Sequence, residues 1–491
     1  MAIPQLHAAQ DATWHGDHAN PDVTNGDNWD FSINPGTSAI FGDIEISSYA
    51  PYIPSGKSIS LTNIVFTGSA RNPYIFSGDA ELHSQLHLSG NVTLQSRGDV
   101  TFNDTVEVVL TSGEHDVSVF DDTKLTVAGK VTAASGVTSI VKSGKGTLVL
   151  SGDNTFNGGL TIAAGTITLA SSSHTPDAHS IDYSPVGTGA LTINNTATLS
   201  VLGNGVTLLN DIVLAGAAGA QQNFYTPIGN SLTLGDGSLG SITGEGRLVK
   251  TGLGTLTLTT ANNYHGGTSV GGGILAIGNA SALGDGNLVL DGGAIRLING
   301  LHSITNNIVF DSAHGGTLGG NWTFSTPQTF GAGVTLSPGN SPGAMTFNAG
   351  LTLTGGSADF EFRAPTGTPG TDWDFYSITG DFNLAGLATG GGYTLRVISL
   401  DLANTQGAPI SGLASTTSWI IASATTITGF NAADFTIDSS QFNGGGIFSL
   451  TQSGGNLVLN FTAVPEPSTY ALLGLGLGLS GLAAWRKRRR A

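Results

Sequence analysis

The sequence predicts an all-β protein, mostly a parallel β-helix, and three observations lead to this prediction. Gly accounts for 73 of the 491 residues, about twice its usual share, and it is interleaved with Thr, Leu, Val, Ile and Asn in short alternating runs. Long runs of helix-forming residues with a 3.6-residue period are missing. A strand-and-turn pattern also recurs about 108 residues along the chain, which indicates a repeat architecture rather than one compact core.

The recurring pattern occupies residues 141–170 and 248–278. Each copy reads Val-Lys-x-Gly-x-Gly-Thr-Leu-x-Leu, starting at Val141 and at Val249, and continues with Asn-x-Phe/Tyr-x-Gly-Gly. Alternating Leu, Ile, Val and Thr predict short strands with one face inward, while Gly and Asn supply corners with positive φ. We therefore expect four leucines to point into the coil: Leu148, Leu150, Leu256 and Leu258.

This pattern resembles the autotransporter-associated β-strand repeat, whose hallmark is Lys-x-Gly-x-Gly-Thr-Leu-x-Leu followed by Asn-x-Tyr/Phe-x-Gly-Gly. The resemblance implies a right-handed parallel β-helix, as in the passenger domains of autotransporters. The sequence departs from that family after the repeats, because it closes with an apolar segment that reads as a helix rather than with an outer-membrane barrel. The resemblance therefore does not imply self-export.

Composition divides the chain into four parts. Residues 1–54 are predicted to be an N-terminal segment and cap, with Trp14, Asn28 and Trp29 over the first coil. Residues 55–350 carry the solenoid pattern, which two Pro-Gly turns at 337–343 interrupt. Residues 351–462 have longer, more aromatic strands and predict a C-terminal β domain or cap. Residues 463–491 form a separate signal segment.

The signal segment combines three features in a fixed order. Pro465-Glu466-Pro467 is followed by an uncharged stretch from Ala471 to Trp485. As a helix this stretch reaches roughly 25 Å, enough to enter a bilayer with Tyr470 and Trp485 at its interfaces. The positive-inside rule keeps the closing basic run in the cytoplasm and the rest of the chain outside it. That run consists of Arg486, Lys487, Arg488, Arg489 and Arg490.

These three features resemble the PEP-CTERM sorting signal. The resemblance implies that an exosortase recognises Pro465, Glu466 and Pro467, cuts nearby, and passes the protein to the envelope of a Gram-negative bacterium that makes exopolysaccharide. The protein would be anchored in the inner membrane before processing and would then lie at the cell surface or outside the cell. Residues 1–10 lack the basic and apolar regions of a signal peptide, so we expect that either a start codon placed too late or a truncation has removed its front.

Charge and cysteine content exclude several function classes. The net charge is −17, and without the closing basic run 12 basic residues face 34 acidic ones, a net charge of −22. Such an acidic body repels nucleic acid, so no nucleic-acid partner is expected. Because the chain has no Cys, disulfides and thiolate metal sites are excluded.

Two Gly-rich motifs match enzyme signatures by sequence alone. Gly339-x-Ser341-x-Gly343 has the spacing of a hydrolase nucleophile elbow, but Pro342 lacks the backbone N–H that its oxyanion hole needs. Residues 235–240 match the dinucleotide-binding fingerprint, but a turn-and-strand pattern follows where a helix is required. We interpret both as turns.

Asp121 and Asp122, with His115 nearby, are the best carboxylate candidates for acid–base chemistry. The companion motifs expected in polysaccharide-cleaving β-helices are missing, so we interpret them as a turn with two acids. Metal sites are weakly indicated, and we predict no metal, no cofactor and no catalytic residue. The residues weighed as ligands are His15, Asp17, His18, His83, His87, Asp236 and Asp285.

The function expected from the sequence is that of an exported structural or adhesive protein of the cell surface or extracellular matrix, and not of an enzyme. Its partners would be the exosortase, transiently the inner membrane, and exopolysaccharide or other surface components, as in a biofilm. The alternative is a polysaccharide-binding or polysaccharide-cleaving β-helix protein. That alternative requires acids and aromatic side chains to converge on one groove.

Overall fold

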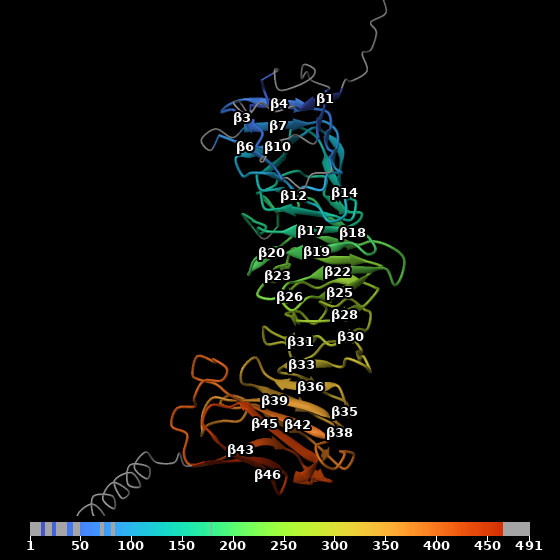
Figure 1. Ribbon diagram of the computed structural model, residues 1–491. Helices are drawn as coiled ribbons and strands as arrows, with labels where there is room; N and C mark the ends of the chain where they lie inside the picture. The colour runs from blue at the N-terminus through green and yellow to red at the C-terminus, as the bar shows by residue number, and fades with distance from the viewer. Residues whose placement is uncertain are drawn as a thin grey trace, which may run out of the picture. The chain divides into compact units, whose positions relative to one another are not determined.

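The computed structural model describes residues 11–14, 22–25, 37–42, 50–68, 73–79, 84–177 and 179–464. They fall into two compact units that divide between Leu318 and Gly319, here called unit 1 and unit 2. Figure 1 shows that β-strands dominate both units, and the helical element among them is a short 3-10 turn, η2 (Ala432–Asp434). In these ranges no helix is long and apolar enough to cross a membrane, and the segment predicted to do so, residues 471–485, lies outside them.

Unit 1 is wound into coils that place successive strands on up to three sides (Figure 1). Strands of neighbouring coils pair in parallel, which confirms the all-β, mostly parallel prediction. The first side holds β1 (Asp11–Trp14), β2 (Ser38–Phe41), β5 (Ile64–Phe66), β8 (Val92–Leu94), β11 (Gly113–Val119), β14 (Thr138–Ser143), β16 (Leu160–Ile162), β18 (Leu191–Ile193), β21 (Ile212–Leu214), β24 (Ile242–Gly244) and β27 (Asn263–Tyr264).

The other two sides of unit 1 follow in chain order. The second side holds β3 (Tyr52–Ile53), β6 (Tyr74–Gly78), β9 (Val100–Phe102), β12 (Lys124–Val127), β15 (Thr147–Leu150), β17 (Thr166–Leu169), β19 (Thr198–Val201), β22 (Gln221–Tyr225), β25 (Arg247–Thr251), β28 (Thr268–Val270), β30 (Leu288–Leu290) and β32 (Ile308–Phe310). The third side holds two sheets, made of β4 (Ser58–Leu61), β7 (Ser84–Leu88), β10 (Val106–Leu110) and β13 (Val131–Ala133), and of β20 (Val206–Leu208), β23 (Ser231–Leu234), β26 (Thr255–Leu258), β29 (Ile274–Ile277) and β31 (Ala294–Leu297). The division between the units falls within β33 (Gly316–Gly320).

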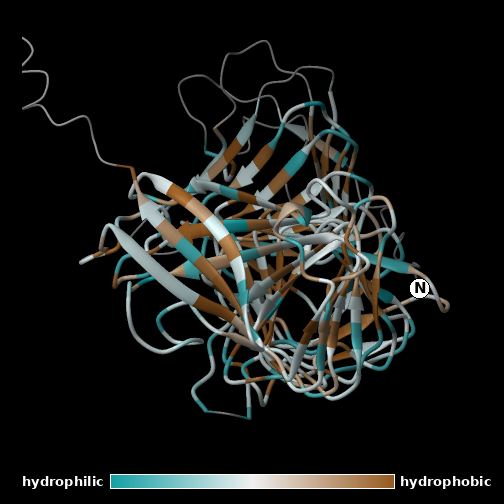
Figure 2. Cartoon of the chain, turned by 90° about the horizontal axis from the view of Figure 1, so that it is seen from below, coloured by the Kyte–Doolittle hydropathy of each residue, from teal (hydrophilic) through white to brown (hydrophobic). Residues whose placement is uncertain are grey.

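The interior of unit 1 is filled by every second residue of most strands, and Figure 2 shows hydrophobic and hydrophilic residues alternating along the strands. Leu148 and Leu150 are each 2% exposed, and Leu256 and Leu258 are fully buried, so the predicted inward direction is confirmed. In-register pairing stacks such residues into columns, for example Ile140, Leu160, Leu191, Ile212 and Ile242. Burying each of these side chains contributes about 1.5–3 kcal/mol.

Aromatic rings fill the interior of the earliest described coils. Trp14, which the sequence predicted to belong to a cap, is buried on β1, with its ring centroid 5.6 Å from that of Phe41. Phe41 stacks on Phe66 at 5.2 Å, and Phe76 stacks on Phe102 at 4.7 Å. Large rings thus replace Leu and Ile in the columns here. Asn28 and Trp29 lie outside the described residues.

Unit 2 also begins with parallel pairing on three sheets, and this pairing continues past residue 350. Its strands are β34 (Thr323–Phe324), β37 (Ala344–Phe347), β40 (Phe375–Ile378), β43 (Thr416–Ser423), β47 (Asn456–Ala463) and β46 (Gly446–Ser453) in one sheet, β35 (Gln328–Phe330), β38 (Leu351–Leu353), β41 (Asp381–Asn383) and β44 (Thr426–Thr428) in a second, and β36 (Val334–Pro338), β39 (Gly356–Phe362), β42 (Tyr393–Ser399) and β45 (Phe435–Gln441) in a third. The pairing becomes antiparallel at the end, where β47 lies between β43 and β46.

The core of unit 2 is richer in aromatic side chains. Trp419 is fully buried, and its indole Nε1 donates a hydrogen bond of 2.9 Å to the carbonyl of Ala364. Its ring lies 4.8 Å from that of Phe362 and 6.4 Å from that of Phe461. The longer strands predicted for this region supply these rings, because each pairs over seven or eight residues.

Candidate functional site

The predicted sorting residues lie outside the described part of the chain, which ends at Val464. They comprise the motif Pro465, Glu466 and Pro467, the interfacial Tyr470 and Trp485, and the basic run Arg486, Lys487, Arg488, Arg489 and Arg490. His15, Asp17, His18 and His83 lie outside it as well.

The predicted cluster of Asp121, Asp122 and His115 is divided between the surface and the interior. Asp121 and Asp122 are exposed in the turn between β11 and β12, where Asp121 lies 3.5 Å from the ammonium of Lys145. His115 is 1% exposed and points inward from β11. Its ring nitrogens lie 2.6 Å from the carbonyl oxygen of Gly90 and 2.9 Å from that of Thr111. The histidine is therefore occupied by the backbone and does not assist the two acids.

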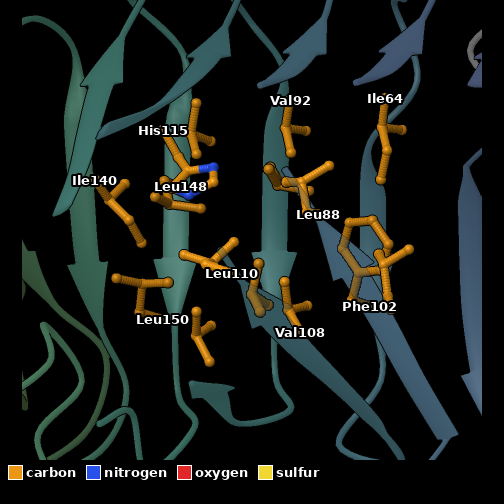
Figure 3. A pocket seen from close by; sticks show the side chains of 15 residues that line it. Ile64, Leu88, Val92, Phe102, Val108, Leu110, His115, Ile140, Leu148 and Leu150 are labelled. Carbon is orange, nitrogen blue, oxygen red and sulfur yellow. The ribbon is translucent and has the colours of Figure 1, made fainter. Parts of the chain in front are cut away.

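An apolar cavity of about 40 Å³ lies inside the coils beside His115. Figure 3 shows aliphatic side chains gathered around it, with the imidazole of His115 among them. Its lining otherwise consists of Leu, Ile, Val and Phe side chains, so water finds few hydrogen-bonding partners there. A ligand pocket measures about 300–1,000 Å³, so this cavity is a packing defect rather than a sugar-binding site.

The two enzyme-like motifs are turns between strands. After Ser341, whose φ is +96°, the chain enters strand β37 rather than the helix of a nucleophile elbow. After Gly240 it enters β24, so the helix of a dinucleotide site is absent here too. Within 235–240 the Asp236 carboxylate accepts hydrogen bonds from the N–H groups of Ser238 and Leu239, each at 2.8 Å.

Each repeat copy buries a lysine that the sequence had not singled out. Lys142 and Lys250 are fully buried and point inward, among columns of apolar residues. The ammonium of Lys142 donates to the carbonyls of Ser143, Gly144 and Ala164 at 2.7, 2.8 and 3.2 Å. That of Lys250 donates to their counterparts Thr251, Gly252 and Gly272 at 2.8, 2.8 and 3.0 Å. All three N–H groups of each ammonium thus donate hydrogen bonds to backbone carbonyls at a corner of the coil.

Burial lowers the pKa of both lysines to about 8, because an ammonium loses its hydration inside the coil. The carboxylate of Asp116 partly opposes this effect at Lys142. The period-two pattern contained a signal for both side chains, since Lys142 shares its strand face with Ile140 and Lys250 shares its face with Leu248.

The repeat asparagines link three successive coils. The amide oxygen of Asn154 accepts from the N–H of Val131 at 2.7 Å, and its amide nitrogen donates to the carbonyl of Pro185 at 2.7 Å. Asn262 makes the equivalent pair of bonds, to the N–H of Ile242 at 2.8 Å and to the carbonyl of Ala282 at 2.6 Å. Lysine and asparagine together explain why the motif requires these residue types.

Two histidines on the described surface of unit 1 each lie near two carboxylates. In the first group, His314 Nδ1 lies 2.6 Å from Asp291 Oδ1 and 3.3 Å from Asp311 Oδ1. One donor atom from each of these residues falls within 4.8 Å of the others. This group could not be recognised from the sequence, because its signal is a 20-residue spacing that becomes visible only once the coil length is known.

The second group places an imidazole between two acids. His265 Nδ1 lies 3.0 Å from Asp285 Oδ2, and His265 Nε2 lies 3.9 Å from Glu245 Oε1. Asp285, weighed from the sequence as a loose calcium ligand, is thus engaged with a histidine. These side chains are 43–65% exposed, so their ion pairs contribute little to stability.

Comparison with protein families identifies two features of the chain. The profile of the Passenger-associated-transport-repeat matches residues 140–169 and 248–277. The profile of the PEP-CTERM protein-sorting motif matches residues 463–490. The chain therefore carries two such repeats and a C-terminal sorting motif, and both resemblances recognised in the sequence are confirmed.

The chain is also similar to the adhesin BmaC autotransporter of Brucella suis biovar 1 (strain 1330). The two sequences are 34% identical over 201 residues, which cover 40% of this chain and 5% of the adhesin. No solved structure matches the chain. Together with the sorting motif, this similarity supports an exported surface protein.

Proposed function

We propose that the protein is an exported structural or adhesive component of the cell surface or extracellular matrix, delivered by an exosortase. The observation that carries the proposal is the presence of passenger-type repeats and a C-terminal sorting motif in one chain. The similarity to an adhesin supports the adhesive reading, although the aligned segment is a small part of that protein.

The coils of unit 1 suit contact along an extended surface. Their interior is packed mainly with aliphatic and aromatic side chains, and most polar residues lie outside on strands and corners. We propose exopolysaccharide or other surface components, as in a biofilm, as partners on those outer faces. We also propose that the coils wind right-handed, because crossover connections between parallel strands take that hand in nearly all proteins.

The proposed function is not catalytic. The pairing of Asp121 with Lys145 and the separation of His115 from both acids support this view. If it is correct, the purified protein releases no reducing ends from polysaccharide, and Asp121→Asn and Asp122→Asn variants behave as the wild type does. Turnover that either substitution abolishes would show the protein to be an enzyme.

In the proposed sorting, the motif, the apolar stretch and the basic run of residues 463–490 have separate roles. Proline favours an extended backbone in itself and in the residue before it, so the two prolines of Pro465-Glu466-Pro467 would suit recognition by a processing enzyme. The apolar stretch would hold the chain in the inner membrane until cleavage, and the basic run would stop its translocation because each Arg costs about 2.5–3.5 kcal/mol to bury.

The test replaces Pro465, Glu466 and Pro467 with Ala in a host that has an exosortase and supplies a signal peptide. Wild-type protein should appear outside the inner membrane without an epitope placed at residues 486–491, whereas the triple variant should remain in the inner membrane with the epitope. As a control, a Ser468→Ala variant, which changes the residue directly after the motif, should be sorted normally. If wild type and triple variant both keep the epitope in the membrane, the segment is an ordinary anchor and the sorting proposal is wrong.

A further inference from the structure

We propose that Asp291, Asp311 and His314 form a binding site for one divalent transition-metal ion of the zinc type. The site lies on a corner of unit 1, and it is independent of the sorting function proposed above. Three features carry the proposal: the position of the two carboxylates, the turn that brings the imidazole to them, and the chemistry of the three donor atoms.

The two carboxylates occupy the same corner position in successive coils. Leu290, at the end of β30, pairs with Phe310, at the end of β32, and an Asp follows each strand directly. The two preceding coils have Thr251 and Gly271 at this position, as the register of β25, β28 and β30 shows. Two like charges therefore lie one coil apart, about 4.8 Å in a β-sheet, where earlier coils carry none.

The turn after β32 returns an imidazole to this pair. The corner after β30 takes three residues, 291–293, whereas the corner after β32 takes five, 311–315. The longer turn is closed by a hydrogen bond of 2.9 Å from Gly315 N–H to the Asp311 carbonyl, and it is tied to the coil before by one of 2.8 Å from Gly292 N–H to the Gly315 carbonyl. His314 then lies over Gly292, where an added Cβ would be 3.5 Å from the Cβ of His314.

The three donor atoms fit a small divalent ion. A tetrahedral zinc ion with bonds of about 2.0–2.1 Å separates its ligand atoms by about 3.3 Å. His314 Nδ1 is 3.3 Å from Asp311 Oδ1 and 2.6 Å from Asp291 Oδ1, and the latter distance is that of the hydrogen bond the ion would replace. The side chains are 39–66% exposed, so water can complete the coordination.

The donor types select the class of ion. One imidazole and two carboxylates suit Zn²⁺ and its transition-metal neighbours, whereas Ca²⁺ prefers six to eight oxygen ligands. The N–H groups of Ala313 and His314 hydrogen-bond to the Asp311 carboxylate and hold it in place in the turn. A bound ion would neutralise the two acids and link the coils that carry β30 and β32.

The second histidine group provides a matched control. His265 also lies near two acids on neighbouring coils, but Asp285 approaches its Nδ1 and Glu245 its Nε2. The two nitrogens of an imidazole face different directions, so one ion cannot bind both acids together with this ring. Both groups combine one imidazole with two carboxylates, and the convergence of the donor atoms is the difference.

The experiment is isothermal titration calorimetry of the full chain, purified in detergent and stripped with EDTA, with ZnCl₂ and separately with CaCl₂. The wild type should bind one Zn²⁺ saturably and should bind Ca²⁺ far more weakly. His314→Ala and Asp291→Asn should each weaken the Zn²⁺ affinity at least about tenfold. His265→Ala should leave it unchanged.

A second readout guards against misfolded variants. Zn²⁺ should slow amide hydrogen exchange in residues 288–315 of the wild type and not in His314→Ala, and without metal the two proteins should exchange alike. The proposal is overturned if the wild type shows no saturable Zn²⁺ binding, if His314→Ala binds Zn²⁺ as well as the wild type, or if Ca²⁺ binds equally well without need of His314.

Discussion

The two repeat copies have the same side-chain contacts but lie on different sides of the coil. In the first copy Lys142 lies on β14, in the sheet of the first side, and in the second copy Lys250 lies on β25, in the sheet of the second side. Each lysine nevertheless donates to three carbonyls at 2.7–3.2 Å, and each asparagine links the coils before and after it.

The pairing of the strands explains this rotation. From Lys142 the column runs through Ile162, Ile193 and Leu214 to Gly244 on β24, one strand before β25. The separation of about 108 residues is therefore four coils and one further side. The motif specifies a corner and the strands on either side of it, whichever side they occupy, and the interior columns accept it on either face.

The largest effect should come from the first corner glycine of each copy. Gly144 and Gly252 have φ of +68° and +75°, and an added Cβ would lie 2.2 Å from the Val119 carbonyl oxygen and 2.3 Å from that of Thr226. Gly144→Ala and Gly252→Ala should each destabilise the surrounding coils by about 4 kcal/mol, since the backbone of the preceding coil must move. Hydrogen exchange of peptides from those coils measures the loss.

Gly205→Ala is the control for that pair. Its φ is +80°, but an added Cβ there meets no atom within 4 Å, so only the conformational cost of about 1 kcal/mol remains. Equal small effects at all three positions would show that the contact between coils is not what the motif glycines provide.

The buried lysines should show the next largest effect. Lys142→Met and Lys250→Met keep the apolar stem but leave three carbonyls without their donor. Each should lower the free energy of unfolding by about 3 kcal/mol, a net loss that already includes the gain from no longer burying a charge. The exposed Lys145→Met should change stability by less than about 0.5 kcal/mol. Losses that differ by more than about 1 kcal/mol between the two buried sites would contradict the equivalence of the two corners.

The pH dependence of stability should follow from the same lysines. Their pKa is about 8 in the folded protein and 10.5 in the unfolded chain, so both states are protonated below pH 8. Between pH 8 and 10.5 the unfolded state binds more protons, and the free energy of unfolding should therefore rise, by about 3 kcal/mol for each lysine. Urea unfolding across this range should show the rise in the wild type, and a smaller one in Lys250→Met. If the free energy of unfolding of the wild type fell relative to that of Lys250→Met over this range, the predicted effect of the lysines would be refuted.

The smallest effect should come from a position near each buried lysine at which the two copies differ, with Asp116 near Lys142 and Asn223 near Lys250. Asp116 accepts a hydrogen bond of 2.7 Å from the Ser143 hydroxyl, and Asn223 accepts one of 2.6 Å from the Thr251 hydroxyl at the equivalent place. Asp116→Asn should keep the hydrogen bond and lower the pKa of Lys142 by a fraction of a unit, because it removes the one charge that raises this pKa. Titration of ¹³Cε-labelled lysine by NMR measures the change, and an equal shift at Lys250 would contradict a local cause.

The sequence was sufficient to predict the strands, the inward leucines and the corners, because these depend on alternation and on turn residues within a few positions. It was not sufficient to predict which side each repeat occupies. The steps along the column from Lys142 to Gly244 are 20, 31, 21 and 30 residues long, so a side cannot be counted from the sequence. The buried lysines were predictable from their strand phase, but their positive charge suggested an outward direction.

The candidate metal group was hidden for a related reason. Asp291, Asp311 and His314 have no recognisable ligand spacing in the sequence, and they meet only because one coil here takes 20 residues and the next corner is two residues longer. The carboxylates that the sequence did single out, Asp121 and Asp122, lie next to His115 in the sequence but on the opposite face of the coil wall.

Export with removal of the C-terminal segment is the central claim, and the mass of the mature protein tests it most directly. Intact-mass spectrometry of the wild-type protein released by an exosortase-containing host should show a chain that lacks residues 486–491 and the apolar stretch before them, while retaining both repeats. A full-length chain that still carries Arg486–Ala491 and is recovered solely from the inner membrane would contradict the claim.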